Sequence, residues 1–336
     1  MTEPTRPVDD AFRAEVGRAL ETRGFALVHP DPRDVDPATF RSDPWEGVVR
    51  LTGKAPELLE RQPVAPVPWG RSFASTKGFT PLHTDSQLYA GRPAELLLMA
   101  CECSASEGGE SKLLDTWALL RELEVRDKEL WGLLFDYWRK IPFLFGAVTG
   151  PTLSLRQGRA VFTHSPQLDA GDVIAARLAP YLATATVHTL RPEAGDVLLV
   201  DNQRMLHGRA AFRGDERVFT RILAFLPEPW SRPAAILERA WIAQDRNTER
   251  LASLPELARR RLGFGETPSL GAARRQIVLD MLRGVPPGVL ARRHSVDEAE
   301  LYRWRDLALR SVDAALEDAA RELEACESAL SRLLDE

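Results

Sequence analysis

The chain has 336 residues, with 44 Lys or Arg, 49 Asp or Glu and a formal net charge of −5. This balance excludes a whole-molecule basic field of the kind that steers proteins onto nucleic acid or anionic lipid, and a hydrophobic share of 44% excludes a disordered chain. No run approaches the roughly 20 apolar residues of a membrane helix, the N-terminus has no signal-peptide pattern, and three cysteines make no disulfide framework. We therefore expect a cytoplasmic protein with no membrane partner.

The first 70 residues predict little regular structure. Residues 9–23 have the apolar spacing of a short amphipathic helix, and residues 24–28 are typical of a strand. Residues 29–70 are rich in proline, which favours loops with one or two short helices.

From Pro81 to Phe225, short apolar runs typical of strands dominate. Helical patterns interrupt them near residues 117–140 and 172–186. Short strands separated by Gly, Pro and Asp turns predict a sandwich or a barrel. The expected strands are Leu96–Cys101, Ser111–Leu114, Thr152–Leu155, Ala160–Thr163, Val197–Val200 and Val218–Phe225.

The pattern changes after Pro229. Residues 233–334 show no convincing strand and indicate successive helices, with breaks at 263–268 and 284–288. We therefore expect two regions, a β-rich domain over residues 1–230 and a helical C-terminal region over residues 231–336.

Two histidines and one carboxylate are placed where they could share a metal ion. On an extended segment His83 and Asp85, two residues apart, point to the same side. His207 follows the expected strand Val197–Val200 and a turn. Two His and one carboxylate leave open coordination positions, the arrangement in which non-haem Fe(II) oxygenases activate O₂. Because an isolated H-x-D pattern is weak evidence, the surrounding motifs carry the assignment.

Four motifs follow one another along the chain: Phe79–Asp85, Gly108–Ser111, Gly195–Asn202 with His207–Arg209, and Arg217 with Arg221. In order and spacing they resemble the TauD/TfdA and clavaminate-synthase-like dioxygenases over roughly residues 10–228. The resemblance implies an α+β fold, a double-stranded β-helix (jelly-roll) core with flanking helices, to which this chain adds an all-helical C-terminal extension. It also implies Fe(II) as the cofactor and 2-oxoglutarate as the co-substrate.

The resemblance also implies roles for single residues. Those that match the family's catalytic iron ligands are His83, Asp85 and His207. Arg221, fourteen residues after the second histidine, matches the arginine that pairs with the far carboxylate of 2-oxoglutarate, and Ser111 matches a hydroxyl that hydrogen-bonds it. Arginine suits this task because its fork binds a desolvated carboxylate in a bidentate manner. Arg217 shares a strand face with Arg221 by spacing and is either an anchor for the co-substrate or the substrate or a solvated edge residue. Arg204, Arg209 and Arg217 could each receive an anionic group of the substrate.

The expected reaction is hydroxylation of an unactivated C–H bond in a small amino-acid-like or other anionic substrate, and natural-product biosynthesis would be a fitting setting. O₂ and this substrate are the expected small-molecule partners. Related halogenases have Gly or Ala in place of Asp85, so the resemblance implies no halogenation. Two alternatives stay open: desaturation or cyclisation with the same cofactors, and, in another class, a DNA-binding regulator that uses the jelly roll as a ligand sensor.

The C-terminal region contains two further patterns. Residues 272–310 resemble the helix-turn-helix of transposase-type proteins, with Ser295 as the N-cap of the second helix. That helix begins with acidic residues where base-reading side chains normally lie, so packing against protein is favoured over binding to nucleic acid. Residues 311–334 carry a heptad apolar seam, which predicts packing against another helix, either from residues 233–290 or from a second subunit. A homo-oligomer formed through the C-terminal helices is therefore expected. The seam consists of Val312, Leu316, Ala319, Leu323, Cys326, Leu330 and Leu333.

Overall fold

The computed structural model describes residues 5–67, 72–85, 92–143, 146–156, 158–166, 171–230, 233–253, 277–281, 287–294, 296–305 and 308. The chain divides into two compact units, Met1–Pro268 and Ser269–Glu336. The first unit contains every site residue that the sequence predicts.

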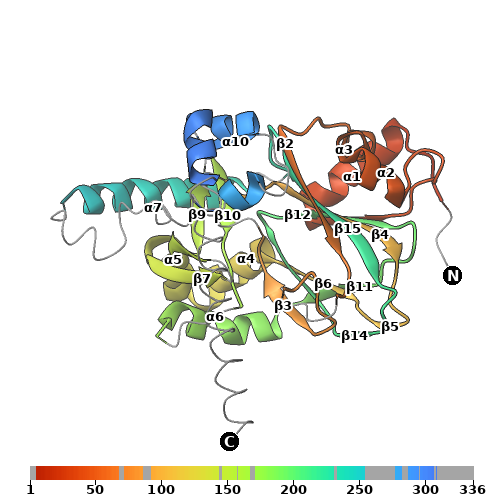
Figure 1. The fold of residues 1–336 in the computed structure, drawn as a ribbon. Helices are drawn as coiled ribbons and strands as arrows, with labels where there is room; N and C mark the ends of the chain where they lie inside the picture. The colour runs from red at the N-terminus through yellow and green to blue at the C-terminus, as the bar shows by residue number, and fades with distance from the viewer. Residues whose placement is uncertain are drawn as a thin grey trace, which may run out of the picture. The chain divides into compact units, whose positions relative to one another are not determined.

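A five-stranded antiparallel sheet forms one half of the first unit (Figure 1). Its strand order is β1 (Phe25–Val28), β12 (Val197–Asp201), β4 (Leu96–Cys103), β15 (Val218–Phe225) and β2 (Leu58–Val64). One face of this sheet packs on three helices, α1 (Asp10–Arg23), α2 (Pro37–Ser42) and α3 (Pro44–Thr52). Asp9, Asp36 and Asp43 cap these helices at their N-termini by accepting backbone N–H groups.

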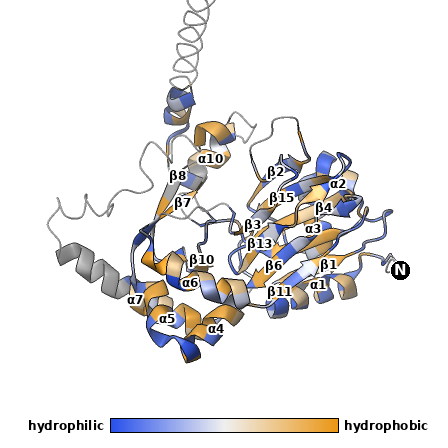
Figure 2. Cartoon of the chain, turned by 90° about the horizontal axis from the view of Figure 1, so that it is seen from below, coloured by the Kyte–Doolittle hydropathy of each residue, from blue (hydrophilic) through white to orange (hydrophobic). Residues whose placement is uncertain are grey.

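A four-stranded antiparallel sheet forms the other half, in the order β11 (Val187–Leu190), β6 (Ser111–Asp115), β13 (Met205–Arg209) and β3 (Thr80–His83). Buried side chains from both sheets, among them Leu97, Leu113, Leu198 and Met205, join in one apolar cluster. Figure 2 shows hydrophobic residues, in orange, along the strands of both sheets. Two antiparallel sheets with a shared core are consistent with the expected jelly roll.

A second layer of elements adjoins the four-stranded sheet. It consists of three helices and two hairpins: α4 (Thr116–Arg126), α5 (Lys128–Asp136), α6 (Val173–Thr184), β7 (Arg139–Phe143) with β8 (Gly146–Gly150), and β9 (Leu153–Arg156) with β10 (Arg159–Phe162). The strands β5 (Glu107–Gly108) and β14 (Phe212–Arg213) form a separate two-stranded sheet. The expected helical stretch at 117–140 is therefore two helices followed by a strand. Asp127 separates the two helices because it caps α5.

Helix α7 (Ala234–Ser253) belongs to the first unit, which therefore extends beyond the expected boundary at residue 230. Its residues Ile236, Ala240 and Ala243 are buried in the same apolar cluster as α4, α5 and β9. An amphipathic helix that buries its apolar stripe on the first unit belongs to that unit, so the change in composition at 230 is not a structural boundary.

In the second unit the structure describes helix α10 (Pro287–His294) and further helical residues at 277–281 and 298–305. Ile277, Leu290 and Leu301 form a small buried cluster there. The expected heptad helix over residues 311–334 lies outside the described residues. Among the helices that the structure does describe, none is both long and apolar enough to cross a membrane.

Candidate metal centre and adjoining cavity

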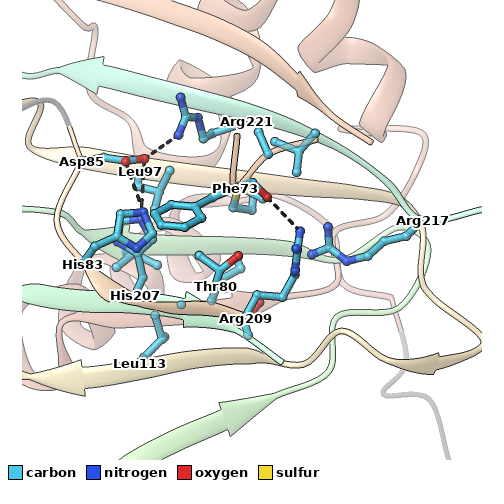
Figure 3. Close-up of a pocket in the computed structure, with 17 residues that line it drawn as sticks. Phe73, Thr80, His83, Asp85, Leu97, Leu113, His207, Arg209, Arg217 and Arg221 are labelled. Carbon is cyan, nitrogen blue, oxygen red and sulfur yellow. Dashed lines mark hydrogen bonds and ion pairs between the residues drawn. The ribbon is translucent and has the colours of Figure 1, made fainter. Parts of the chain in front are cut away.

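His83, Asp85 and His207 lie together at one end of the pairing between β3 and β13. His83 is the last residue of β3 and pairs in register with His207 of β13. Nε2 of His83 lies 3.4 Å from Oδ1 of Asp85, and Nε2 of His207 lies 3.5 Å from Oδ2. One donor atom from each residue can be chosen so that all three lie within 4.8 Å of one another. In Figure 3 the Asp85 carboxylate faces the two imidazole rings.

The imidazoles are arranged as metal ligands. Nδ1–H of His83 donates to the carbonyl of Pro81 at 2.9 Å, which leaves the lone pair of Nε2 directed at the shared position. Burial, together with the neighbouring His83, lowers the pKa of His207, so its ring is held in the neutral form that binds metal. Two imidazoles and a carboxylate at this spacing fit a divalent transition metal such as Fe(II).

Gly208 allows β3 and β13, the strands that carry His83 and His207, to lie close together. A Cβ at this position would lie 2.6 Å from the carbonyl oxygen of Thr80 on β3. The ladder between the two strands also shifts register between His207 and Arg209. The ring centroids of His83 and His207 are 4.4 Å apart as a result of this close approach.

Asp85 is held from two sides. Its backbone N–H donates to Asn202 Oδ1 at 3.3 Å, and Asn202 is fully buried after β12. Nη1 of Arg221 donates to Oδ2 of Asp85 at 2.6 Å, while Nη2 binds Gln62 on β2. Burial alone would raise the pKa of Asp85, but the charge of Arg221 holds it well below its usual range. The carboxylate is therefore ionised and oriented.

A cavity of about 90 Å³ adjoins this centre. Apolar side chains from both sheets form most of its wall, including Leu97, Leu113, Leu198 and Val200. Arg209 and Arg217 lie on the opposite side of the cavity from the two histidines (Figure 3). The cavity is thus apolar along its length, with the candidate metal centre at one side and two guanidinium groups at the other.

Arg217 is 3% exposed, so the alternative that it is a solvated edge residue is wrong. Its guanidinium carbon lies 4.1 Å from the ring centroid of Phe219 and 5.3 Å from that of Phe212. No carboxylate in the described part of the chain pairs with it. Burial, and the neighbouring positive charge of Arg209, lower the pKa of Arg217 to about 10. A buried cation of this kind favours an anionic ligand.

The remaining residues singled out in the sequence have clear places. Ser111 begins β6, lines the cavity and pairs across the sheet with Arg209. Arg221 also lines the cavity, but its guanidinium already binds Asp85 and Gln62, an ion pair that spacing along one strand could not reveal. Arg204, directly before β13, is bound to Asp115 at 2.7 Å and is not among the residues that line the cavity.

Comparison with known proteins agrees with this geometry. The family model described as taurine catabolism dioxygenase TauD, TfdA family matches residues 3–169 and 168–223. The chain belongs to this family. It is a non-haem Fe(II)- and 2-oxoglutarate-dependent dioxygenase, as the four sequence motifs predicted. The match ends before the C-terminal region, so the helix-turn-helix resemblance of residues 272–310 gains no support.

Solved structures to which this chain is similar include the following three. Asparagine oxygenase in complex with Fe(II), 3-hydroxyasparagine and succinate is 19% identical, with 66% of this chain and 81% of that chain covered and a TM-score of 0.47. The non-haem iron oxygenase OrfP with Fe and α-ketoglutaric acid is 14% identical, with coverages of 65% and 80% and a TM-score of 0.46. PvcB from Pseudomonas aeruginosa is 16% identical, with coverages of 66% and 83% and a TM-score of 0.47. A search of curated proteins finds no match.

Proposed function

We propose that His83, Asp85 and His207 bind the Fe(II) of this dioxygenase and that the adjoining cavity holds 2-oxoglutarate. The observation that carries the proposal is the convergence of three donor atoms within 4.8 Å of one another beside a cavity with a buried guanidinium, that of Arg217, which pairs with no described carboxylate. Three protein ligands leave room on the metal for the co-substrate and O₂. Bound iron and 2-oxoglutarate together supply the oxidising chemistry.

Within the cavity, Arg217 and Ser111 bind the far carboxylate of 2-oxoglutarate. A dicarboxylate whose 2-oxo acid end lies at the metal directs its other carboxylate along the apolar cavity toward Arg217. Burial makes that pairing strong because the partner charges are removed from water. This assignment moves the anchoring role from Arg221, where the resemblance placed it, to Arg217.

Arg221 keeps the Asp85 carboxylate in its binding orientation. One oxygen of Asp85 stays available to the metal while the other accepts the hydrogen bond from Arg221. Because Asp85 occupies a ligand position, no site is left open for a halide ligand at this place. We therefore propose oxygen transfer, with hydroxylation favoured over desaturation or cyclisation.

The substrate that we propose is a small amino-acid-like or other anionic molecule. Family membership supports this class, since the family takes its description from catabolism of taurine, a small amino sulfonate. The residues around the metal must hold the target carbon near the iron and exclude water, so placement is the main task of the protein.

The test is an anaerobic titration of the purified protein with Fe(II) and 2-oxoglutarate, followed by visible absorption. The wild-type protein should show the weak charge-transfer band of a metal-bound 2-oxo acid. His83→Ala, Asp85→Ala and His207→Ala should abolish it, while His188→Ala, at an exposed histidine of β11, should retain it. A band of full strength in His207→Ala would disprove the ligand assignment. A substrate screen that reads succinate release would then identify the substrate.

A further inference from the structure

Arg209 lies two residues after His207 on β13 and is 6% exposed. We propose that Arg209 is a positioning residue that couples occupation of the co-substrate cavity to the placement of loop 72–79. The proposal rests on the proposed function, because it takes the ligand of the cavity to be a 2-oxo dicarboxylate. It assigns to Arg209 a task that neither the metal ligands nor Arg217 performs.

The guanidinium of Arg209 holds the loop through three backbone carbonyls. Nη2 donates to the carbonyl of Thr76 at 2.7 Å and to that of Gly78 at 2.8 Å, and Nη1 donates to that of Phe73 at 3.3 Å. Three acceptors bound by one planar fork fix the path of the loop relative to β13.

The loop in turn forms part of the site. Phe73 and Ala74 line the cavity, and the ring centroid of Phe73 lies 5.2 Å from that of His83. Movement of loop 72–79 would open the cavity wall and remove the ring that packs on a metal ligand. Arg209 therefore connects the loop to the strand that carries the other histidine ligand.

Nε is the one guanidinium nitrogen of Arg209 that has no acceptor among the described residues. This nitrogen is buried, and Arg209 lines the cavity. A buried donor left unsatisfied is costly, and the neighbouring Arg217 adds a second positive charge that no described carboxylate balances. A carboxylate at this end of the cavity would accept from Nε and lie beside both cations.

Ligand binding and loop placement are then linked. While Arg209 is bound to the loop, its Nε makes no hydrogen bond to a described residue, so an anion that binds Nε favours this placement of the loop. By reciprocity, any change that releases the loop weakens binding of the far carboxylate. The coupling acts on the far carboxylate and not on the 2-oxo acid group at the metal.

Hydrogen exchange of the Fe(II)-loaded protein under anaerobic conditions tests this coupling. 2-Oxoglutarate should slow amide exchange in loop 72–79 by about tenfold, the effect of one charge-assisted hydrogen bond. Saturating 2-oxopentanoate should not, because it has the same carbon chain and 2-oxo acid group but a methyl in place of the far carboxylate. The charge-transfer band confirms that each ligand is bound at the metal.

Two lysine variants separate the role of Arg209 from general stability. Arg209→Lys keeps the charge but cannot bind three carbonyls and a carboxylate at once, so loop 72–79 should exchange faster and lose its response to 2-oxoglutarate. Arg204→Lys is the matched control, since Arg204 is also buried and bonded to backbone carbonyls but is remote from the loop. In Arg204→Lys, 2-oxoglutarate should slow amide exchange in loop 72–79 as it does in the wild type.

The outcomes are distinct. If wild-type protein shows the band with 2-oxoglutarate but equal loop protection by both ligands, the coupling is wrong while the proposed function stands. If 2-oxoglutarate gives no band at all, the proposed function itself fails. Should Arg209→Lys not fold, the comparison of the two ligands on wild-type protein still decides.

Discussion

Nη1 of Arg221 donates a 2.6 Å hydrogen bond to Oδ2 of Asp85. The two residues come from different parts of the fold, Arg221 from the middle of β15 in the five-stranded sheet and Asp85 from the segment after β3. The ion pair orients the one acidic candidate ligand before any metal binds. A ligand held in this way loses less freedom on coordination, which raises metal affinity.

Arg221→Ala should therefore weaken Fe(II) binding by about ten- to a hundredfold, the usual effect of losing a partner that orients a metal ligand. Anaerobic equilibrium titration of Fe(II) measures this change. Arg213→Ala, which removes an exposed arginine near the same strand, serves as the control. An unchanged Fe(II) dissociation constant in Arg221→Ala would show that the ion pair has no part in the metal site.

Arg217→Met should raise the KM for 2-oxoglutarate by at least about thirtyfold, because a buried charge pair broken on one side costs about 2–5 kcal/mol. Arg213→Met should leave this KM near its wild-type value. Steady-state succinate release provides both numbers. Equal KM values for the two variants would remove Arg217 from the co-substrate site.

The same Arg217→Met variant should be more stable than the wild type when no ligand is bound. Burial lowers the pKa of Arg217 to about 10. At neutral pH its buried charge therefore lowers the free energy of unfolding. Methionine keeps the stacking volume over Phe219 without the charge. Thermal unfolding of the ligand-free proteins measures the difference, and a lower Tm for the variant would contradict it.

Gly208→Ala should reduce Fe(II) affinity more than it reduces stability. The added Cβ would meet the Thr80 carbonyl at 2.6 Å, so β13 must move away from β3 and carry His207 with it. We expect a loss of at least about tenfold in Fe(II) affinity. Gly150→Ala in β8, where a Cβ meets nothing within 4 Å, is the control for a strand glycine.

His164 should make the ligand-free protein sensitive to acid. Burial, aided by Arg139 and His83, lowers its pKa from 6.5 to about 4. Below pH 6.5 the unfolded chain therefore binds a proton on His164, whereas the folded chain binds it only near pH 4. The free energy of unfolding falls by roughly 2–3 kcal/mol between these two pH values. His164→Gln should lose less of its free energy of unfolding between pH 7 and pH 4. Denaturant titrations at several pH values test this, and parallel curves for the two proteins would contradict it.

The candidate metal site could be predicted from sequence because its information is local. His83 and Asp85 share a face through their two-residue spacing, and the motif around His207 supplies the third member. The strongly apolar strands, such as Leu96–Cys103 and Val197–Asp201, were also predicted because their burial on both faces leaves a continuous hydrophobic run. Strand β2, by contrast, is an edge strand with the charged and proline-containing sequence LLERQPV, so no periodic pattern marks it.

Only the tertiary structure shows that Arg217 and Arg221 have different partners. Spacing places Arg217 and Arg221 on one strand face, but β15 begins at Val218 and its register on β4 shifts between Val218 and Phe219. That irregularity breaks the two-residue alternation, so the two guanidinium groups meet different partners. The hydrogen bonds from Arg209 to loop 72–79 and the packing of α7 on the first unit also depend on contacts between residues distant in sequence. Local pattern determined which residues carry the chemistry, and long-range packing determined what each of them touches.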